Sequence, residues 1–315
     1  MHKSVVVQQA YKRPRSATFR RVQPLWSVMG WELFRYKEMR FSKFLMLGIA
    51  LFFVLGAWSW ASAYTYLPYA STSVLGMTLE MPTTFSWTLA VTTPFLVADL
   101  VTRDRKLRVH ELVMTTPIPT WAYVWGRYLA GMSVCFILAV LALPLILLMN
   151  GIFFVLQPHA TPASNVGAIV ALWIITVLPI LLVTGLSFCL CTLLPRRATL
   201  LKLLVLMGWL IAWYSGAVVG WSVVDGQSPP EQITAWDPTT IALLLQLMRE
   251  MYAKSGTLSS SAGIHALDAQ RAIVAQQSLP DLTPWLLTHL LYAVLGLLLV
   301  ALTALLFKRF RNALD

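Results

Sequence analysis

Six stretches of the chain are long and apolar enough to cross a lipid bilayer as helices. An α-helix rises about 1.5 Å per residue, so about 20 consecutive apolar residues span the hydrocarbon core. Hydrophobic residues make up 58% of the 315 residues and charged residues only 12%, a balance too apolar for a soluble domain. We therefore predict an all-α polytopic membrane protein with six transmembrane helices. They lie at residues 44–64, 85–101, 128–148, 166–194, 203–224 and 285–307.

The fourth stretch is longer than one crossing requires. It runs for 29 residues without a charge, and it contains Pro179 and Gly185. These residues favour a kinked or tilted helix within the domain of residues 44–307. A partly re-entrant segment is the alternative.

The distribution of Lys and Arg predicts the orientation. With both termini in the cytoplasm, 21 of the 24 positive residues fall on the inner side, as the positive-inside rule requires. The net charge of +11 then indicates binding to anionic lipid at the inner surface and needs no nucleic acid. We predict a multi-pass protein of the cell membrane in which residues 1–43 and 308–315 are both cytoplasmic.

Residues 1–43 combine a basic tail with an amphipathic pattern. Apolar side chains recur at helical spacing: Trp26, Met29, Leu33 and Tyr36. The polar side chains between and after them should face water: Glu32, Arg35, Glu38 and Arg40. This pattern predicts a helix lying flat on membrane lipid before the first span. A frayed basic tail is the alternative, and it fits residues 1–21 better than the aromatic part that follows.

Residues 102–127 form a charged segment between the second and third spans. Charged and apolar side chains are interspersed in it and predict a short helix at the membrane surface, which the prolines at its end terminate. Its candidate contact residues are Arg105, Leu107, Arg108, Glu111, Leu112, Met114, Thr116 and Pro117. We interpret the segment as a handle for a cytoplasmic partner. An ordinary basic anchor lying on lipid is the alternative.

The connection at residues 222–284 is long enough for a small subdomain outside the membrane. Asp237 is suited to cap a helix with Pro238 at the first helical position. An apolar face would follow: Ile241, Leu244, Leu245, Met248 and Met251. Lipid, the rest of the domain or a second copy would have to cover it.

Motifs for chemistry are absent from the sequence. It contains no GxxxxGK phosphate loop, no HExxH and no GxSxG, so we nominate no catalytic, cofactor-binding or metal site and predict that the chain is not an enzyme. Cys135, Cys189 and Cys191 fall inside spans, which is typical of packing residues. The predicted spans carry ionisable groups only near their ends, Asp99 and His289, which argues against an ion-coupled carrier. Energy for transport should come from a separate protein.

Residues 103–131, RDRKLRVHELVMTTPIPTWAYVWGRYLAG, following an amphipathic helix and two spans, resemble the ABC-2 family of ABC-transporter permeases. In that family a charged stretch leads to a hydrophobic, Ser/Thr and Pro run, and a Gly-(Lys/Arg) pair opens the third span. Here the run is residues 111–118 and the pair is Gly126 and Arg127. The architecture matches over most of the chain, the motif only over this segment.

The resemblance implies a permease subunit of an exporter. Its partners would be cytoplasmic ABC ATPase subunits, which bind ATP and Mg, and a second permease subunit, the same or a related chain. Residues 103–114 would be the coupling helix seated in the ATPase, and residues 23–40 the connecting helix. Three other interpretations stay open: a non-transporting membrane scaffold subunit, a lipid-modifying membrane enzyme, for which the inner loops lack paired acids, and a secondary carrier.

Overall fold

The computed structural model describes residues 17–38, 88, 90–98, 118–156, 166–221, 231–243, 245–246 and 281–307. This part of the chain consists of helices joined by turns, without a strand. The labelled helices are α1 (Ala17–Glu38), α5 (Thr120–Leu156), α6 (Val166–Val177), α7 (Ile180–Leu193), η2 (Pro195–Arg197), α8 (Ala198–Trp221), α9 (Glu231–Thr234) and α12 (Thr283–Leu306). Residues 90–98, 241–243 and 245–246 are helical as well.

Four described helices are long and apolar enough to cross a membrane. They are Thr120–Leu141, Val170–Leu193, Pro195–Gly220 and Thr283–Leu306. The prediction of an all-helical protein is confirmed for the described residues, and four of the helices have the length and composition that membrane-spanning helices need. The first predicted span, 44–64, lies outside the described residues, and the second is helical at residues 88 and 90–98. The total of six spans and the sides of the termini stay predictions.

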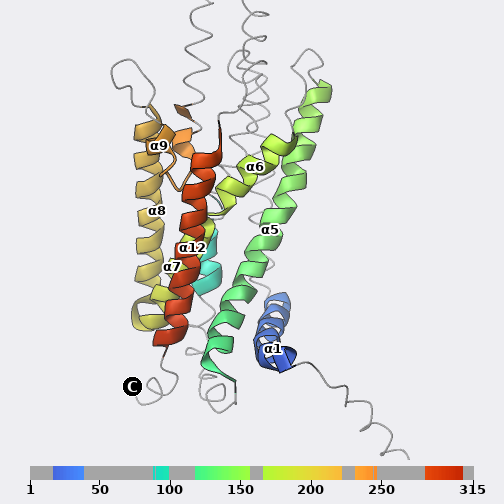
Figure 1. Ribbon diagram of the computed structural model, residues 1–315, viewed down its shortest axis with the longest axis vertical. Helices are drawn as coiled ribbons and strands as arrows, with labels where there is room; N and C mark the ends of the chain where they lie inside the picture. The colour runs from blue at the N-terminus through green and yellow to red at the C-terminus, as the bar shows by residue number, and fades with distance from the viewer. Residues whose placement is uncertain are drawn as a thin grey trace, which may run out of the picture.

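The long helices run side by side along the molecule (Figure 1). Helix α1 lies beside the first half of α5, at what we call the α1 end, and α9 lies at the opposite end, the α9 end. Residues 90–98 pack between α7 and α8, because Ala90 shares one hydrophobic cluster with Val183, Val205 and Trp209. The chain thus forms a bundle with polar contacts at both ends.

Helices α7 and α12 cross at two glycines. A Cβ placed on Gly185 would lie 2.9 Å from the Cα of Gly296 and closer still to its carbonyl oxygen. A Cβ on Gly296 would meet the backbone of Leu181 in the same way. Only hydrogen side chains allow the two backbones to pass at this separation, as in other helix pairs within membranes.

The predicted kink in the fourth span is observed as a break between α6 and α7. Leu178 and Pro179 form a turn there, and the backbone pairs irregularly through it, with Leu181 N donating to Leu178 O over 3.1 Å. Pro179 has no N–H, so the helix cannot satisfy the carbonyl of Ile175, four residues earlier. His289 Nδ1, on α12, lies 2.8 Å from that carbonyl oxygen and takes the place of the missing donor.

Helices α8 and α12 leave most of their apolar surface uncovered. Only 22% and 28% of their most apolar stretches are buried, against 56% for that of α5. The exposed side chains on α12 are mainly leucines, among them Leu287, Leu298 and Leu305. Such faces fit the hydrocarbon of a bilayer or another apolar helix.

Candidate functional site

Helix α1 approaches the backbone of α5 at a glycine. A Cβ added to Gly126 would lie 2.8 Å from Cβ of Val28 and 3.1 Å from the carbonyl oxygen of Leu25. The absence of a side chain at Gly126 therefore sets the distance between the two helices. This close contact brings the next residue of α5, Arg127, against the buried face of α1.

Arg127 and Glu32 form a buried ion pair between these helices. Arg127 Nη2 lies 3.0 Å from Glu32 Oε1, and the two side chains are 1% and 2% exposed. Arg35 Nη1 lies 3.8 Å from the same oxygen at the edge of the site. The guanidinium of Arg127 also lies over the ring of Tyr123, 4.4 Å from the centroid, in cation–π geometry.

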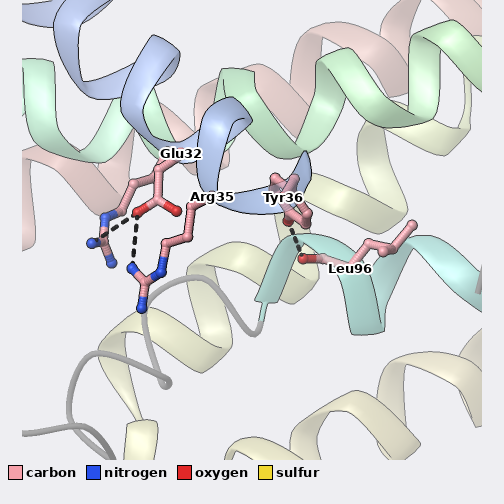
Figure 2. A network of polar contacts seen from close by, with 5 residues as sticks. Glu32, Arg35, Tyr36 and Leu96 are labelled. Atoms are coloured by element: carbon pink, nitrogen blue, oxygen red, sulfur yellow. Dashed lines mark hydrogen bonds and ion pairs between the residues drawn. The ribbon is translucent and has the colours of Figure 1, made fainter. Parts of the chain in front are cut away.

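A second polar contact joins α1 to the helix at residues 90–98. The hydroxyl of Tyr36 donates to the carbonyl oxygen of Leu96 over 2.9 Å. Figure 2 shows this bond beside the carboxylate of Glu32 and the guanidinium of Arg35. In the sequence, residues 99–117 follow the helix at residues 90–98 and precede Ile118. Helix α1 therefore contacts the chain on both sides of this segment.

Aromatic contacts extend the site into the bundle. The ring of Tyr123 stacks on Phe307, the residue that follows α12, with centroids 5.9 Å apart. Five residues further along α5, Tyr128 forms a hydroxyl–hydroxyl hydrogen bond of 3.2 Å with Thr184 and an edge contact with Phe188, with ring centroids 5.5 Å apart. Thr184 and Phe188 both lie on α7. A displacement of α1 relative to α5 would thus disturb contacts with α7 and α12.

The prediction that Glu32 faces water is wrong. Glu32 is buried because α5 offers it the guanidinium of Arg127, a partner from a distant part of the sequence. Of the four predicted interfacial residues, Met29, Leu33 and Tyr36 are half-buried, and Trp26 is 58% exposed. The outward face of α1 is aromatic: Trp26, Trp31 and Phe34. The helix forms as predicted, but its protein-facing side contains the acid.

The eight predicted coupling residues lie outside the described part of the chain. These are Arg105, Leu107, Arg108, Glu111, Leu112, Met114, Thr116 and Pro117. The Gly126 and Arg127 pair was predicted only as a motif, and Glu32 was not predicted as the partner of Arg127. A single acid within the aromatic part of α1 was the available signal, since a buried guanidinium needs an anion.

A second polar cluster lies at the α9 end around Asp237, which was predicted as a helix cap but not as a buried residue. Asp237 is 7% exposed, and its carboxylate accepts bonds from Thr239 N at 2.8 Å, Thr239 Oγ1 at 2.6 Å and Ala242 N at 2.8 Å. Burial raises the pKa of Asp237, against the opposing effect of these hydrogen bonds.

The predicted helix start at Pro238 is wrong. Asp237 caps as expected, but residues 238–240 form a turn and the helix begins at Ile241. Thr240 has a φ of 60°, which a helix cannot contain. Ile241 packs on a cluster with Leu172, Leu243 and Trp285, so its predicted apolar side is partly covered by this chain itself. Leu244, Met248 and Met251 are outside the described residues.

The described residues offer little for metal or redox chemistry. Cys135, Cys189 and Cys191 are free thiols and buried, in agreement with packing roles. No group of three His, Cys, Asp or Glu side chains that would hold a metal occurs within the described ranges.

No family model matches this chain, and no curated protein or solved structure matches it significantly.

Proposed function

We propose that this chain is the membrane-spanning permease subunit of an ABC-2-type exporter, driven by a separate cytoplasmic ATPase that binds ATP and Mg. One observation carries the proposal. Helix α1 contacts the chain on both sides of residues 99–117, through Tyr36 with Leu96 and through Glu32 with Arg127. A segment moved by a partner would then pull on α1 and α5 together.

The contacts suit the transmission of force. Separating the buried carboxylate of Glu32 from the guanidinium of Arg127 loses a close charge contact in an apolar setting, so the two helices resist sliding. Arg127 also contacts Tyr123, which stacks on Phe307 after α12. Movement at residues 99–117 is thereby connected to helices from three parts of the sequence.

A second permease subunit completes the proposal. The apolar surfaces of α8 and α12 are mostly uncovered in a single chain, which supports a partner helix on part of this surface and lipid on the rest. The partner is the same chain or a related one. Native mass spectrometry in mild detergent should find two permease chains and two ATPase chains. A single permease chain with its ATPase would contradict the dimer.

Affinity purification of the chain tests the link to an ATPase. The wild type should retain an ATPase subunit, and Leu112→Asp with Met114→Asp should release it. Burying one such apolar side chain stabilises a contact by about 1.5 to 3 kcal/mol, and about 1.4 kcal/mol is a tenfold change in affinity. The affinity of the double variant for the ATPase should therefore be roughly tens to hundreds of times lower than that of the wild type.

The matched control is Ser259→Asp with Ser260→Asp, which adds the same charge in the connection at residues 222–284. Its ATPase should be retained. Loss in both variants would indicate a general effect of charge. If both double variants retain the ATPase and are expressed normally, residues 102–127 are not the ATPase contact. That result would favour the alternative, a basic anchor on lipid. A wild-type chain that purifies without an ATPase would favour the scaffold subunit.

A further inference from the structure

The helix at residues 90–98 packs against α7 and α8 in two consecutive hydrophobic clusters. The first contains one residue of this helix, one of α7 and two of α8: Ala90, Val183, Val205 and Trp209. The second, about two turns further on, contains one residue of each: Ala98, Cys191 and Ala198. The helix at residues 90–98 therefore runs parallel to α7 and antiparallel to α8. The residues between the two clusters lie where the three helices meet.

Pro94 lies between these clusters and deprives one backbone carbonyl of its helical donor. A proline has no N–H, so Pro94 cannot donate to the carbonyl of Ala90, four residues earlier. Both residues are buried. Buried carbonyls are almost always paired, either with a protein donor or with an ordered water molecule. The carbonyl of Ala90 is therefore an acceptor that needs a donor from outside its own helix.

Trp209 contributes a donor without an acceptor to the same cluster. The side chain is 5% exposed, and its Nε1 has no hydrogen-bond partner within the described part of the chain. An indole N–H can only donate, and a buried one usually finds an acceptor. Trp209 and Ala90 share the first cluster, yet the indole makes no direct bond to the carbonyl of Ala90. A donor and an acceptor that both need partners thus lie in one apolar region.

Two buried hydroxyls accompany them. Thr93 lies one turn after Ala90, and Ser187 lies on α7 one turn after the α7 residue of the first cluster. Both residues are fully buried, and neither hydroxyl has a hydrogen-bond partner among the residues that the structure describes. Other hydroxyls in this bundle bond to a carbonyl of their own helix, as Thr184 Oγ1 does to Ile180 O over 2.9 Å. Thr93 and Ser187 instead offer theirs to the space between the helices.

We propose that an ordered water molecule binds where the helix at residues 90–98 meets α7 and α8. The water accepts a hydrogen bond from Trp209 Nε1 and donates one to the carbonyl of Ala90. The hydroxyls of Thr93 and Ser187, which both donate and accept, supply its other partners. Buried waters typically make about three hydrogen bonds to groups of this kind. A cation would not suit the indole N–H and an anion would not suit the carbonyl, so the site selects a ligand that donates and accepts.

Water-edited NMR of the full-length protein in lipid nanodiscs, labelled with ¹⁵N-tryptophan, tests the site directly. The indole signal of Trp209 is assigned by its loss in Trp209→Phe, or by contacts to the methyl groups of Val205 if that variant does not fold. We expect magnetisation to pass from water to the Trp209 Nε1–H. A Trp209 signal that receives none would overturn the proposal.

Variants of the two hydroxyls locate the water. Thr93→Val combined with Ser187→Ala should weaken the transfer to Trp209, because the water then keeps only two of its four partners. Thr303→Val is the matched control, since this buried threonine bonds within α12, to Leu299 O over 2.8 Å. Its transfer to Trp209 should equal that of the wild type. Equal transfer in the double variant and the wild type would contradict a water at this site.

Melting temperatures in detergent test whether the hydroxyls are satisfied. Replacing an unsatisfied buried hydroxyl by an apolar group is neutral or stabilising, whereas replacing one that binds a water removes a hydrogen bond. Thr93→Val and Ser187→Ala should each lower the melting temperature. Together they should lower it by less than the sum, because they share one water. Unchanged or higher values in both single variants, or strictly additive losses, would contradict a shared water.

Discussion

Arg127 and Glu32, which are 95 positions apart in the sequence, meet at 3.0 Å with both side chains almost completely buried. The pair fixes α1 against α5 next to the close contact at Gly126. It places an acid from the N-terminal helix at the entrance of an apolar span. The consequences of this arrangement can be measured in variants of either residue.

Removing one member of the pair should destabilise the protein strongly. Arg127→Met removes the nearer guanidinium of the buried Glu32 carboxylate and leaves Arg35 at 3.8 Å, at a cost of up to about 3 to 5 kcal/mol. Adding Glu32→Leu to this variant should restore most of the stability, because an apolar pair of similar volume is often as stable as a buried ion pair. Thermal unfolding in detergent, monitored by size-exclusion chromatography, measures the loss of stability in the single variant and its recovery in the double variant.

The double variant also separates structure from function. If the ion pair transmits movement, the restored protein should bind its ATPase normally but show reduced substrate-stimulated ATP hydrolysis. Full activity of the folded double variant would assign the pair a structural role only. Equal stability of Arg127→Met and the wild type would contradict the burial of the ion pair.

The aromatic face of α1 should contact lipid. Trp26, Trp31 and Phe34 are 58%, 48% and 63% exposed, and aromatic side chains favour the headgroup region of a bilayer. A fluorophore attached to Phe34→Cys in nanodiscs should be quenched more by spin labels on lipid headgroups than by labels at chain ends. Quenching only by a water-soluble agent would instead place this face in solvent.

The glycine crossing of α7 and α12 should tolerate no side chain. Gly185→Ala would force a Cβ into the backbone of Gly296, and overpacking of this kind costs about 1 to 3 kcal/mol. Gly208→Ala is the matched control, since a Cβ there would have no heavy atom within 4 Å. We expect a lower melting temperature for the first variant and an unchanged or higher one for the second. The same melting temperature for both would contradict the close crossing.

The stability of the first turn of α12 should decrease at acid pH because of Asp281. Its carboxylate accepts bonds from Thr283 Oγ1 at 2.7 Å and Thr283 N at 3.0 Å, and these bonds lower the pKa of Asp281. A lowered pKa contributes stability above the unfolded value of about 3.9, and the contribution is lost as the pH falls through the folded value. Amide exchange in the first turn of α12 should therefore accelerate, after intrinsic correction, below about pH 4. Asp281→Asn should lack this change, and a matching change in that variant would rule out the carboxylate as its cause.

The sequence by itself determined the helical, membrane-type character of the chain and the positions of its long helices. An apolar run such as 285–307 indicates where the chain must satisfy its backbone hydrogen bonds within a helix. That requirement depends only on the local sequence. The break at Pro179 was predictable for the same reason, since a missing N–H acts within one turn. The helix at residues 17–38 was likewise indicated by its own periodicity.

Tertiary structure decided which face of each helix is inside and which polar groups meet. Glu32 was assigned to water because periodicity cannot register a guanidinium 95 positions away. The contacts of His289 with the carbonyls of Ile175 and Asp237 likewise join segments that are 114 and 52 positions apart. The burial of a charge is favourable only when its partner is present, and the partner's position is a property of the folded chain.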